Sequence, residues 1–214
     1  MNIKYKPIAL YILENYIDDI MTESGFKRRS NALVYSRTIG TTKQKLEMVC
    51  YSHPPYYAGS LLHIYPYMSV YFPEINKTAE NMISNEETMT IQQTIRQPIQ
   101  AKAFGTTPWI LMTDAKEEVD AVAEKIRIYM KQYTIPLLDD LKTIDGYIDK
   151  YERQEGNKTI SLSPEYWFYV ASAYAIKGEY AKGLEVLDNR FKGPAIRKYH
   201  ARAFEYLKMK LGEI

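Results

Sequence analysis

Cysteine is nearly absent from this sequence, which holds a single thiol at Cys50. One cysteine cannot form an internal disulfide, so a disulfide-stabilised secreted scaffold is excluded and a reducing compartment is expected. No apolar run approaches the roughly 20 residues that a membrane-spanning helix needs. The apolar start of the chain resembles a signal peptide only briefly, because Glu14, Asp18 and Asp19 interrupt it. We therefore expect a cytoplasmic protein without a membrane partner.

Short motifs of catalytic and cofactor sites are also missing. The chain contains no G-x-G-x-x-G, P-loop, H-E-x-x-H, C-x-x-C or G-x-S-x-G pattern, and each of these has a mechanical reason for its residues and spacing. Its 10 glycines do not cluster, so a backbone cradle for nucleotide phosphates is not expected. We expect no cofactor.

The balance of charge does not point to nucleic acid. The chain has 28 basic and 26 acidic residues. Cations gather near the C-terminus, at Arg197, Lys198, Arg202 and Lys208, off the apolar stripe of an expected helix over residues 195–211. Four exposed cations are common on ordinary helices. The expected partner is therefore a protein or a small polar ligand.

Tyrosine is the residue type in excess, with 20 copies against 6 phenylalanines and 2 tryptophans. Its ring packs while its hydroxyl reaches a partner or water, which suits half-buried positions. The stretch HPPYYAGSLLHIYPYMSVYF, residues 53–72, concentrates this excess. It predicts a loop followed by a strand over residues 61–72, paired with a strand over residues 45–53.

Pleat alternation separates this hairpin into two faces. Leu46, Met48 and Cys50 share an apolar face with the even-numbered residues of 62–72, whereas the odd-numbered residues point the other way. The latter face, with its rim and a neighbouring cation, is the predicted binding surface. Its members are His53, Tyr56, Tyr57, His63, Tyr65, Tyr67, Tyr71 and Arg96.

The remaining pattern predicts an α+β fold. Helices are expected over residues 7–24, after an Asp114/Glu117 capping pair, and from Pro136. Further strands are expected over residues 32–38, 89–99 and 108–113. Helices before and after a run of strands indicate a four- to five-stranded, mainly antiparallel sheet with helices on its Cys50 face. We place this domain at residues 1–155, a linker at 156–163 and a helical extension at 164–214.

Two resemblances accompany this interpretation. SGFKRRSNALVYSR and PWILMTDAKEEVDAVAEKIRIYMKQYTIPLLDDLKTIDGYI resemble an uncharacterised bacterial α+β domain family over residues 8–150. The resemblance carries no activity, although some members resemble immunity-type proteins by gene company. WFYVASAYAIKGEYAKGLEVL resembles one tetratricopeptide repeat, with Gly183 at the place of its usual alanine. That resemblance implies an antiparallel helix pair closed at Gly178, with Ala171 at the closest approach.

The residue pattern favours a non-enzymatic binding or protein-interaction module. Cys50 and His53 do not suggest a nucleophile and base, because alternation sends Cys50 to the apolar face. Two histidines with Glu47 make a poor metal site, so no metal is expected. The alternative is an enzyme with a Tyr/His-lined polar cleft, using His53 or His63 as acid or base and Arg96 as an anion anchor. Whether the tyrosines are open or covered by the C-terminal helices is left undecided.

Overall fold

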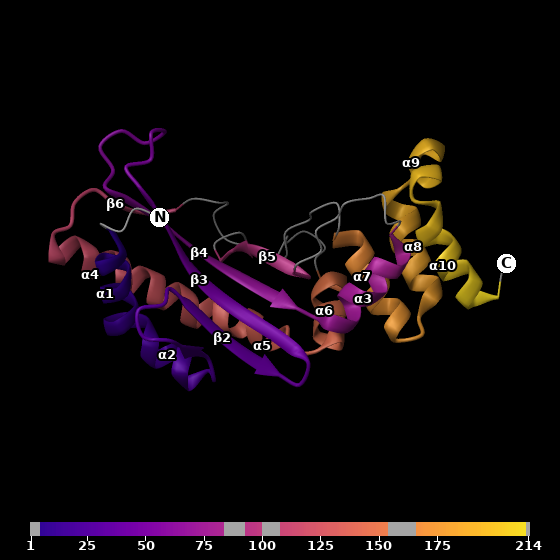
Figure 1. Cartoon of the computed structure of the whole chain (residues 1–214), viewed down its shortest axis with the longest axis horizontal. Helices are drawn as coiled ribbons and strands as arrows, with labels where there is room; N and C mark the ends of the chain where they lie inside the picture. The colour runs from indigo at the N-terminus through magenta and orange to yellow at the C-terminus, as the bar shows by residue number, and fades with distance from the viewer. Residues whose placement is uncertain (1–4, 84–92, 100–107, 154–165, 213–214) are drawn as a thin grey trace. The chain divides into compact units, whose positions relative to one another are not determined.

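The computed structural model describes residues 5–83, 93–99, 108–153 and 166–212. The chain has an α+β fold with a mainly antiparallel sheet and a C-terminal helical hairpin (Figure 1). It forms two compact units, a sheet unit from Met1–Ser69 with Arg96–Asp140 and a helical unit from Val70–Ile95 with Leu141–Ile214. These units do not coincide with the linear division at residue 155 that the sequence suggested, and the expected linker lies outside the described residues. Within the described part of the chain, no helix combines the length and apolar character required to cross a bilayer.

The sheet runs in the order β1-β2-β3-β4-β5, with β6 also paired to β4. Adjacent strands β1/β2, β2/β3 and β4/β6 are antiparallel. The two-residue strand β1 was not predicted, and the expected strand 89–99 is described only at its end, as β5. The strands are β1 (Lys27–Arg28), β2 (Val34–Ile39), β3 (Thr42–Ser52), β4 (Leu62–Tyr71), β5 (Ile95–Pro98) and β6 (Trp109–Leu111).

Helices of the sheet unit pack on the Cys50 face of the sheet, as predicted. The Gln44 side chain of β3 donates to the Leu138 carbonyl of a helix at 2.7 Å, and Gln44 shares its face with Leu46, Met48 and Cys50, all buried. Burial of this face supplies the hydrophobic core of the unit. The helices are α1 (Lys6–Ile12), α2 (Asp18–Glu23), α4 (Lys116–Tyr129) and α5 (Ile135–Asp140).

The first helix is not a uniform α-helix. A π-helical turn, Leu13–Ile17, lies between α1 and α2, and such turns are single-turn insertions in α-helices. Gly25 ends the helix at φ +80°, and the Phe26 amide donates back to the Met21 carbonyl at 2.9 Å. This left-handed C-terminal cap ends the helix directly after the expected range of residues 7–24.

The start of α4 corrects the predicted cap. Ala115 precedes the helix and its side chain makes no cap, so the Asp114/Glu117 pair does not have the expected role. Glu118 takes that place, because its carboxylate accepts from the Met112 and Thr113 amides at 2.6 and 2.9 Å. A carboxylate at the third helical position can satisfy amides that precede the helix, and the sequence has two adjacent glutamates to choose from.

Pro136 does not start a helix. The helix from Lys116 continues through a π-helical turn, Met130–Thr134, into α5 and ends at Asp140. Proline lacks an N–H and clashes with the carbonyl four residues before it. The wider π turn immediately ahead of Pro136 accommodates the missing N–H and the proline ring. The helix therefore ends only at residues 141–143, and the next helix starts there, where the Thr143 hydroxyl accepts from the Gly146 amide at 3.1 Å.

The helical unit contains the predicted hairpin. Its helices α7 and α8 flank Gly178, which has φ +78°. Gly183 lies against Ala171 so closely that an added Cβ would be 3.0 Å from the Ala171 carbonyl oxygen. This is the predicted point of closest approach. The helices of the unit are α3 (Pro73–Met82), α6 (Ile144–Glu152), α7 (Tyr166–Ile176), α8 (Tyr180–Arg190), α9 (Pro194–Tyr199) and α10 (Ala201–Leu211).

The final helix differs from the prediction. It is broken at His200 into α9 and α10, and only α10 buries an apolar stripe, formed by Ala203, Phe204 and Leu207. Ile196 and Tyr199, which would share this stripe in an unbroken helix over residues 195–211, are 48% and 69% exposed. The expected start of the extension, at residue 164, lies outside the described residues.

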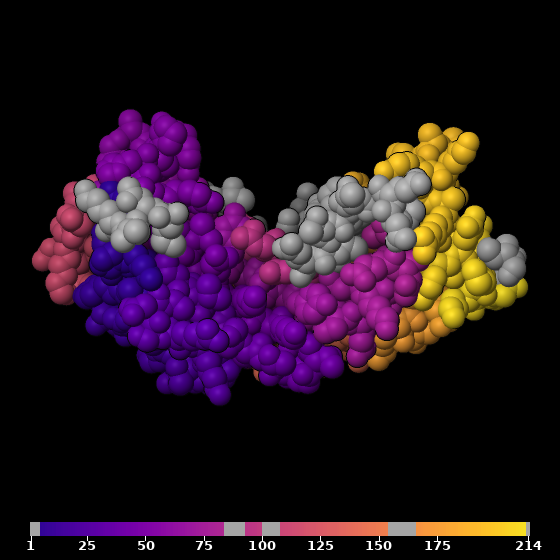
Figure 2. Space-filling view, in the orientation of Figure 1, coloured from indigo at the N-terminus to yellow at the C-terminus, as the bar shows by residue number. Residues whose placement is uncertain are grey.

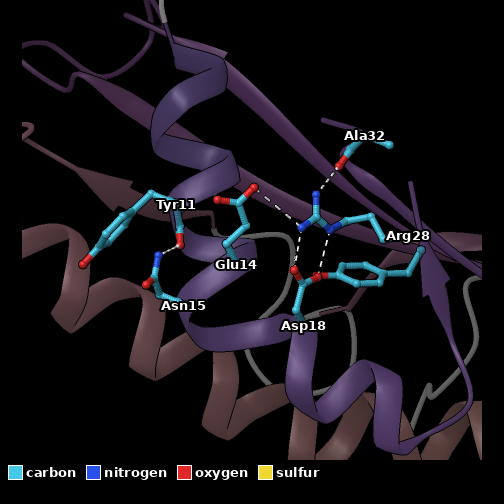
Figure 3. Close-up of polar contacts among 7 residues, drawn as sticks. Tyr11, Glu14, Asn15, Asp18, Arg28 and Ala32 are labelled. Carbon is cyan, nitrogen blue, oxygen red and sulfur yellow. Dashed lines mark hydrogen bonds and ion pairs between the residues drawn. The ribbon is translucent and has the colours of Figure 1, made fainter. Parts of the chain in front are cut away.

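A partly buried ion pair joins α2 to β1 and β2 (Figure 3). Asp18 accepts from Arg28 Nε at 2.8 Å and from the Tyr35 hydroxyl at 2.5 Å. Arg28 also donates to the Ala32 carbonyl at 3.2 Å. The hydrogen bonds from Arg28 and, less strongly, from Tyr35 lower the pKa of Asp18, against the opposing effect of its partial burial. The network fixes the helix against the first two strands of the sheet.

The close approach in the hairpin gives a first prediction. Gly183→Ala should lower the free energy of unfolding by about 1 kcal/mol, because overpacking costs about 1–3 kcal/mol and exceeds the helix-propensity gain of up to about 1 kcal/mol. Urea denaturation measures the change. Gly193→Ala is the matched control, since an added Cβ there has only Ile196 Cδ1 nearby, at 4.0 Å. Equal stability of the two variants would contradict the packing.

The Asp18 network gives a second prediction. The folded protein holds the Asp18 charge to a lower pH than the unfolded chain does, so between the two pKa values the unfolded chain binds more protons and stability falls as pH falls. Asp18→Asn should cost about 1–2 kcal/mol at pH 7, a value reduced for partial exposure, and the gap to wild type should narrow below about pH 4. Denaturation curves across pH test this. The exposed Asp114→Asn should show no such gap.

Candidate binding surface

The predicted tyrosine surface is present in the sheet unit, with some changes in membership. We call Tyr51, Tyr56, Tyr57, Tyr65, Tyr67 and Arg96 the tyrosine face. Tyr51, Tyr65 and Tyr67 come from β3 and β4, on the side opposite Cys50. Tyr56 and Tyr57 come from the β3–β4 loop, which projects from the unit in Figures 1 and 2.

Aromatic packing orders this face although much of it is exposed. Tyr51, Tyr56 and Tyr57 are 50%, 67% and 48% exposed. The Tyr51 and Tyr65 rings meet edge to face at 5.6 Å between centroids. Burial and a hydrogen bond with Tyr56 raise the pKa of Tyr65 to about 12, so its hydroxyl stays protonated at neutral pH. The face is therefore a set of rings that contact one another and carry polar hydroxyls at their tips.

Arg96 supplies the positive charge of the face. Its guanidinium lies 4.7 Å from the centroid of the Tyr67 ring, a cation–π distance. It also pairs with Glu47 at 3.6 Å, and both side chains are about half exposed, at 53% and 47%. The sequence predicted Arg96 as a member of the face, and the structure places it there beside Glu47, which the sequence analysis considered only as a metal ligand.

His63 is not on the surface, which corrects its predicted place. It is 1% exposed and lies under Tyr56 and Tyr57, at centroid distances of 5.4 and 5.5 Å. Neither ring nitrogen has a hydrogen-bond partner among the described residues. Burial lowers the pKa of His63. Alternation placed this residue correctly on the tyrosine side of β4, but the loop folds over it, and no local pattern signals that cover.

His53 also leaves the predicted face. Its φ of +42° takes it out of the pleat, and the Tyr5 hydroxyl lies 2.8 Å from His53 Nδ1. Tyr5 directly precedes α1, which belongs to the opposite side of the sheet. Among the described residues, no ring contact joins His53 to His63, because His53 packs on Tyr5 and His63 lies under Tyr56 and Tyr57.

Two other predicted features have clear outcomes. Cys50 is buried, and burial raises the pKa of its thiol to about 12, which confirms an inert core thiol. Tyr71 is half buried at the end of β4, and it is counted with the helical unit. Among the described residues, no group of three or more His, Cys, Asp or Glu side chains is arranged to hold a metal ion.

A groove of about 490 Å³ adjoins the tyrosine face. It is lined by Leu33, by residues 47–52 of β3 and by residues 54–56 of the loop. Glu47 is the one charged side chain in this lining, and the rest is apolar, aromatic or small. Sequence analysis missed the groove, because the groove depends on where β2 begins beside β3.

Comparison of the chain with protein-family models, curated proteins and solved structures finds no match. The family resemblance drawn from the sequence therefore stays a prediction, and the chemistry of the tyrosine face is the guide to function.

The cover over His63 gives a third prediction. Burial lowers the pKa of His63 in the folded protein. As pH falls below about 6.5, the unfolded chain therefore binds more protons than the folded protein does, and the free energy of unfolding declines from neutral pH toward pH 5. His63→Phe should lose less stability than wild type over that range, measured by thermal melts. His53→Gln, at an exposed histidine, should retain the wild-type decline. An unchanged decline in His63→Phe would contradict the burial.

Proposed function

We propose that this protein is a binding module that recognises a protein partner through its tyrosine face. The observation that carries the proposal is the grouping of Tyr51, Tyr56 and Tyr57, each about half exposed or more, over ordered rings on a side of the sheet opposite its helices. Tyrosine gives large, rigid contact area at low cost in side-chain entropy, and it is enriched where binding energy concentrates.

The charges of the face support a protein partner. Arg96 and Glu47 lie side by side and half exposed, so the face offers one cation and one anion at the border of an aromatic surface. Central aromatic anchors with polar groups at the rim are typical of protein–protein interfaces. The groove lining includes none of His53, His63 and Arg96, the residues of the enzyme alternative.

Site-specific photo-crosslinking tests the proposal. A photoreactive phenylalanine analogue at Tyr57 should give a discrete cross-linked product in the cells that naturally express the chain. Tyr133 is the matched control, because it is 45% exposed, against 48% for Tyr57, and lies on the helical side of the same unit. No product at Tyr57, or identical products at both positions, would contradict the tyrosine face as a binding surface.

A double variant separates recognition from internal packing. Tyr51→Ala with Tyr67→Ala should lower the free energy of unfolding by less than about 1 kcal/mol, since surface substitutions usually stay within about 0.5 kcal/mol each, and it should abolish the Tyr57 product. A loss of several kcal/mol would identify the rings as part of a packed core, where each aromatic truncation costs about 3–5 kcal/mol.

A further inference from the structure

The groove runs along the edge of β3, not over one face of the sheet. Consecutive residues 47–52 line it, so side chains from both faces of the strand contribute. A surface over one face would be lined by alternate residues only. The lining includes Leu33, which directly precedes β2, and no residue of β4. The groove therefore lies on the β2 side of β3.

β2 begins only at Val34, so the antiparallel β3 extends past it and its edge is open there. The last paired residues are Val34 and Glu47, followed by one further bond from the Met48 amide to the Leu33 carbonyl at 2.8 Å. Beyond it, Asn31 adopts a left-handed φ of 61°, and the Ala32 amide bonds to the Arg29 carbonyl at 3.0 Å. This turn takes the chain away from β3.

Backbone groups of β3 point into the space that β2 leaves. In a strand, the backbone N–H and C=O groups of one residue point toward one neighbouring strand, and those of the next residue point toward the opposite neighbour. Met48 pairs toward β2, whereas the His53 amide bonds to the Leu61 carbonyl, on the β4 side. Cys50 and Ser52 therefore direct their N–H and C=O groups into the groove, where the structure describes no backbone partner for them.

We propose that this edge binds an extended peptide segment of the partner protein as an added strand, with apolar side chains on its inner face and a basic side chain on its outer face. The inference rests on the proposed function and names the class of partner. Unpaired N–H and C=O groups in alternation match the backbone of an extended chain. An added strand would place its inner side chains beside Met48 and Cys50, which are apolar.

Charge selects the outer side chain. Glu47, Val49 and Tyr51 border the outer face of the groove, and Glu47 carries its one charge. Glu47 lies opposite Val34 of β2, at the near end of the open edge, and it already pairs with Arg96 at 3.6 Å. A lysine or arginine on the added strand would lie beside the Tyr51 ring, which favours a cation by cation–π attraction. Its extended side chain would reach the Glu47 carboxylate along the groove and share it with Arg96.

A second copy of the chain fits this edge poorly. The turn at Asn31 bounds the edge at one end, and Pro54 and Pro55, which cannot donate to a strand ladder, bound it at the other. Only Cys50 and Ser52 lie between. A stable interface buries about 800 Å² per partner, which two short edges do not supply, whereas a segment of about five residues spans the edge.

Amide hydrogen exchange by NMR tests the proposal. The probe is acetyl-Lys-Val-Lys-Val-Lys-amide at millimolar concentration, and acetyl-Glu-Val-Glu-Val-Glu-amide is its charge-reversed control. The lysine peptide should slow exchange of the Cys50 and Ser52 amides about tenfold or more relative to free protein. The Val49 and Tyr51 amides, which point toward β4, should not change and are the internal control. Glu47→Lys should transfer the preference to the glutamate peptide.

Other outcomes overturn the proposal in distinguishable ways. Slow exchange at Cys50 and Ser52 in the dilute free protein would mean that the chain covers its own edge. Slowing that depends on protein concentration would identify a second copy as the occupant. No slowing with either peptide, while Tyr57 still cross-links a partner, would leave the tyrosine face as the binding surface and reject strand addition. Slowing by the lysine peptide without any Tyr57 product would instead reject the tyrosine face.

Discussion

The pleat of β3 and β4 is the constraint on which the rest of the sheet unit depends. Successive side chains must point to opposite faces, so the same residues that bury Met48, Cys50 and Ile64 under helices present tyrosines on the other side. A shift of one residue in register would exchange the two faces and expose the core. The tyrosine face and the hydrophobic core are therefore specified together by one register.

Irregular turns fit the long helices around this sheet. The π turn at Leu13–Ile17 separates α1 from α2, and the second, at Met130–Thr134, directly precedes Pro136. Each π turn changes the helical repeat locally, so the helix continues past the turn and its apolar stripe stays on the side of the sheet. The ion pair between Asp18 and Arg28 then joins the end of the first of these helices to the start of the sheet.

The edge groove follows from a mismatch in length between β2 and β3, and it adjoins the tyrosine face. β3 extends past the first residue of β2, and the β3–β4 loop folds back over β4. Tyr51 and Tyr56 therefore line the groove and are also members of the tyrosine face. A peptide in the groove would contact backbone on one side and tyrosine rings on the other. Main-chain pairing supplies affinity in such sites, and side-chain contacts supply specificity.

The sequence by itself determined the α+β class, the two faces of the hairpin, the inert thiol and the helix pair at Gly178, because periodicity, turn chemistry and small-residue spacing are local signals. It misplaced the cap of α4 and the role of Pro136, where neighbouring residues offer alternatives of similar free energy. Only the tertiary structure decided that His63 is covered and that His53 leaves the face. It alone decided that β3 has an open edge, since loop cover and strand ends depend on contacts between segments distant in sequence.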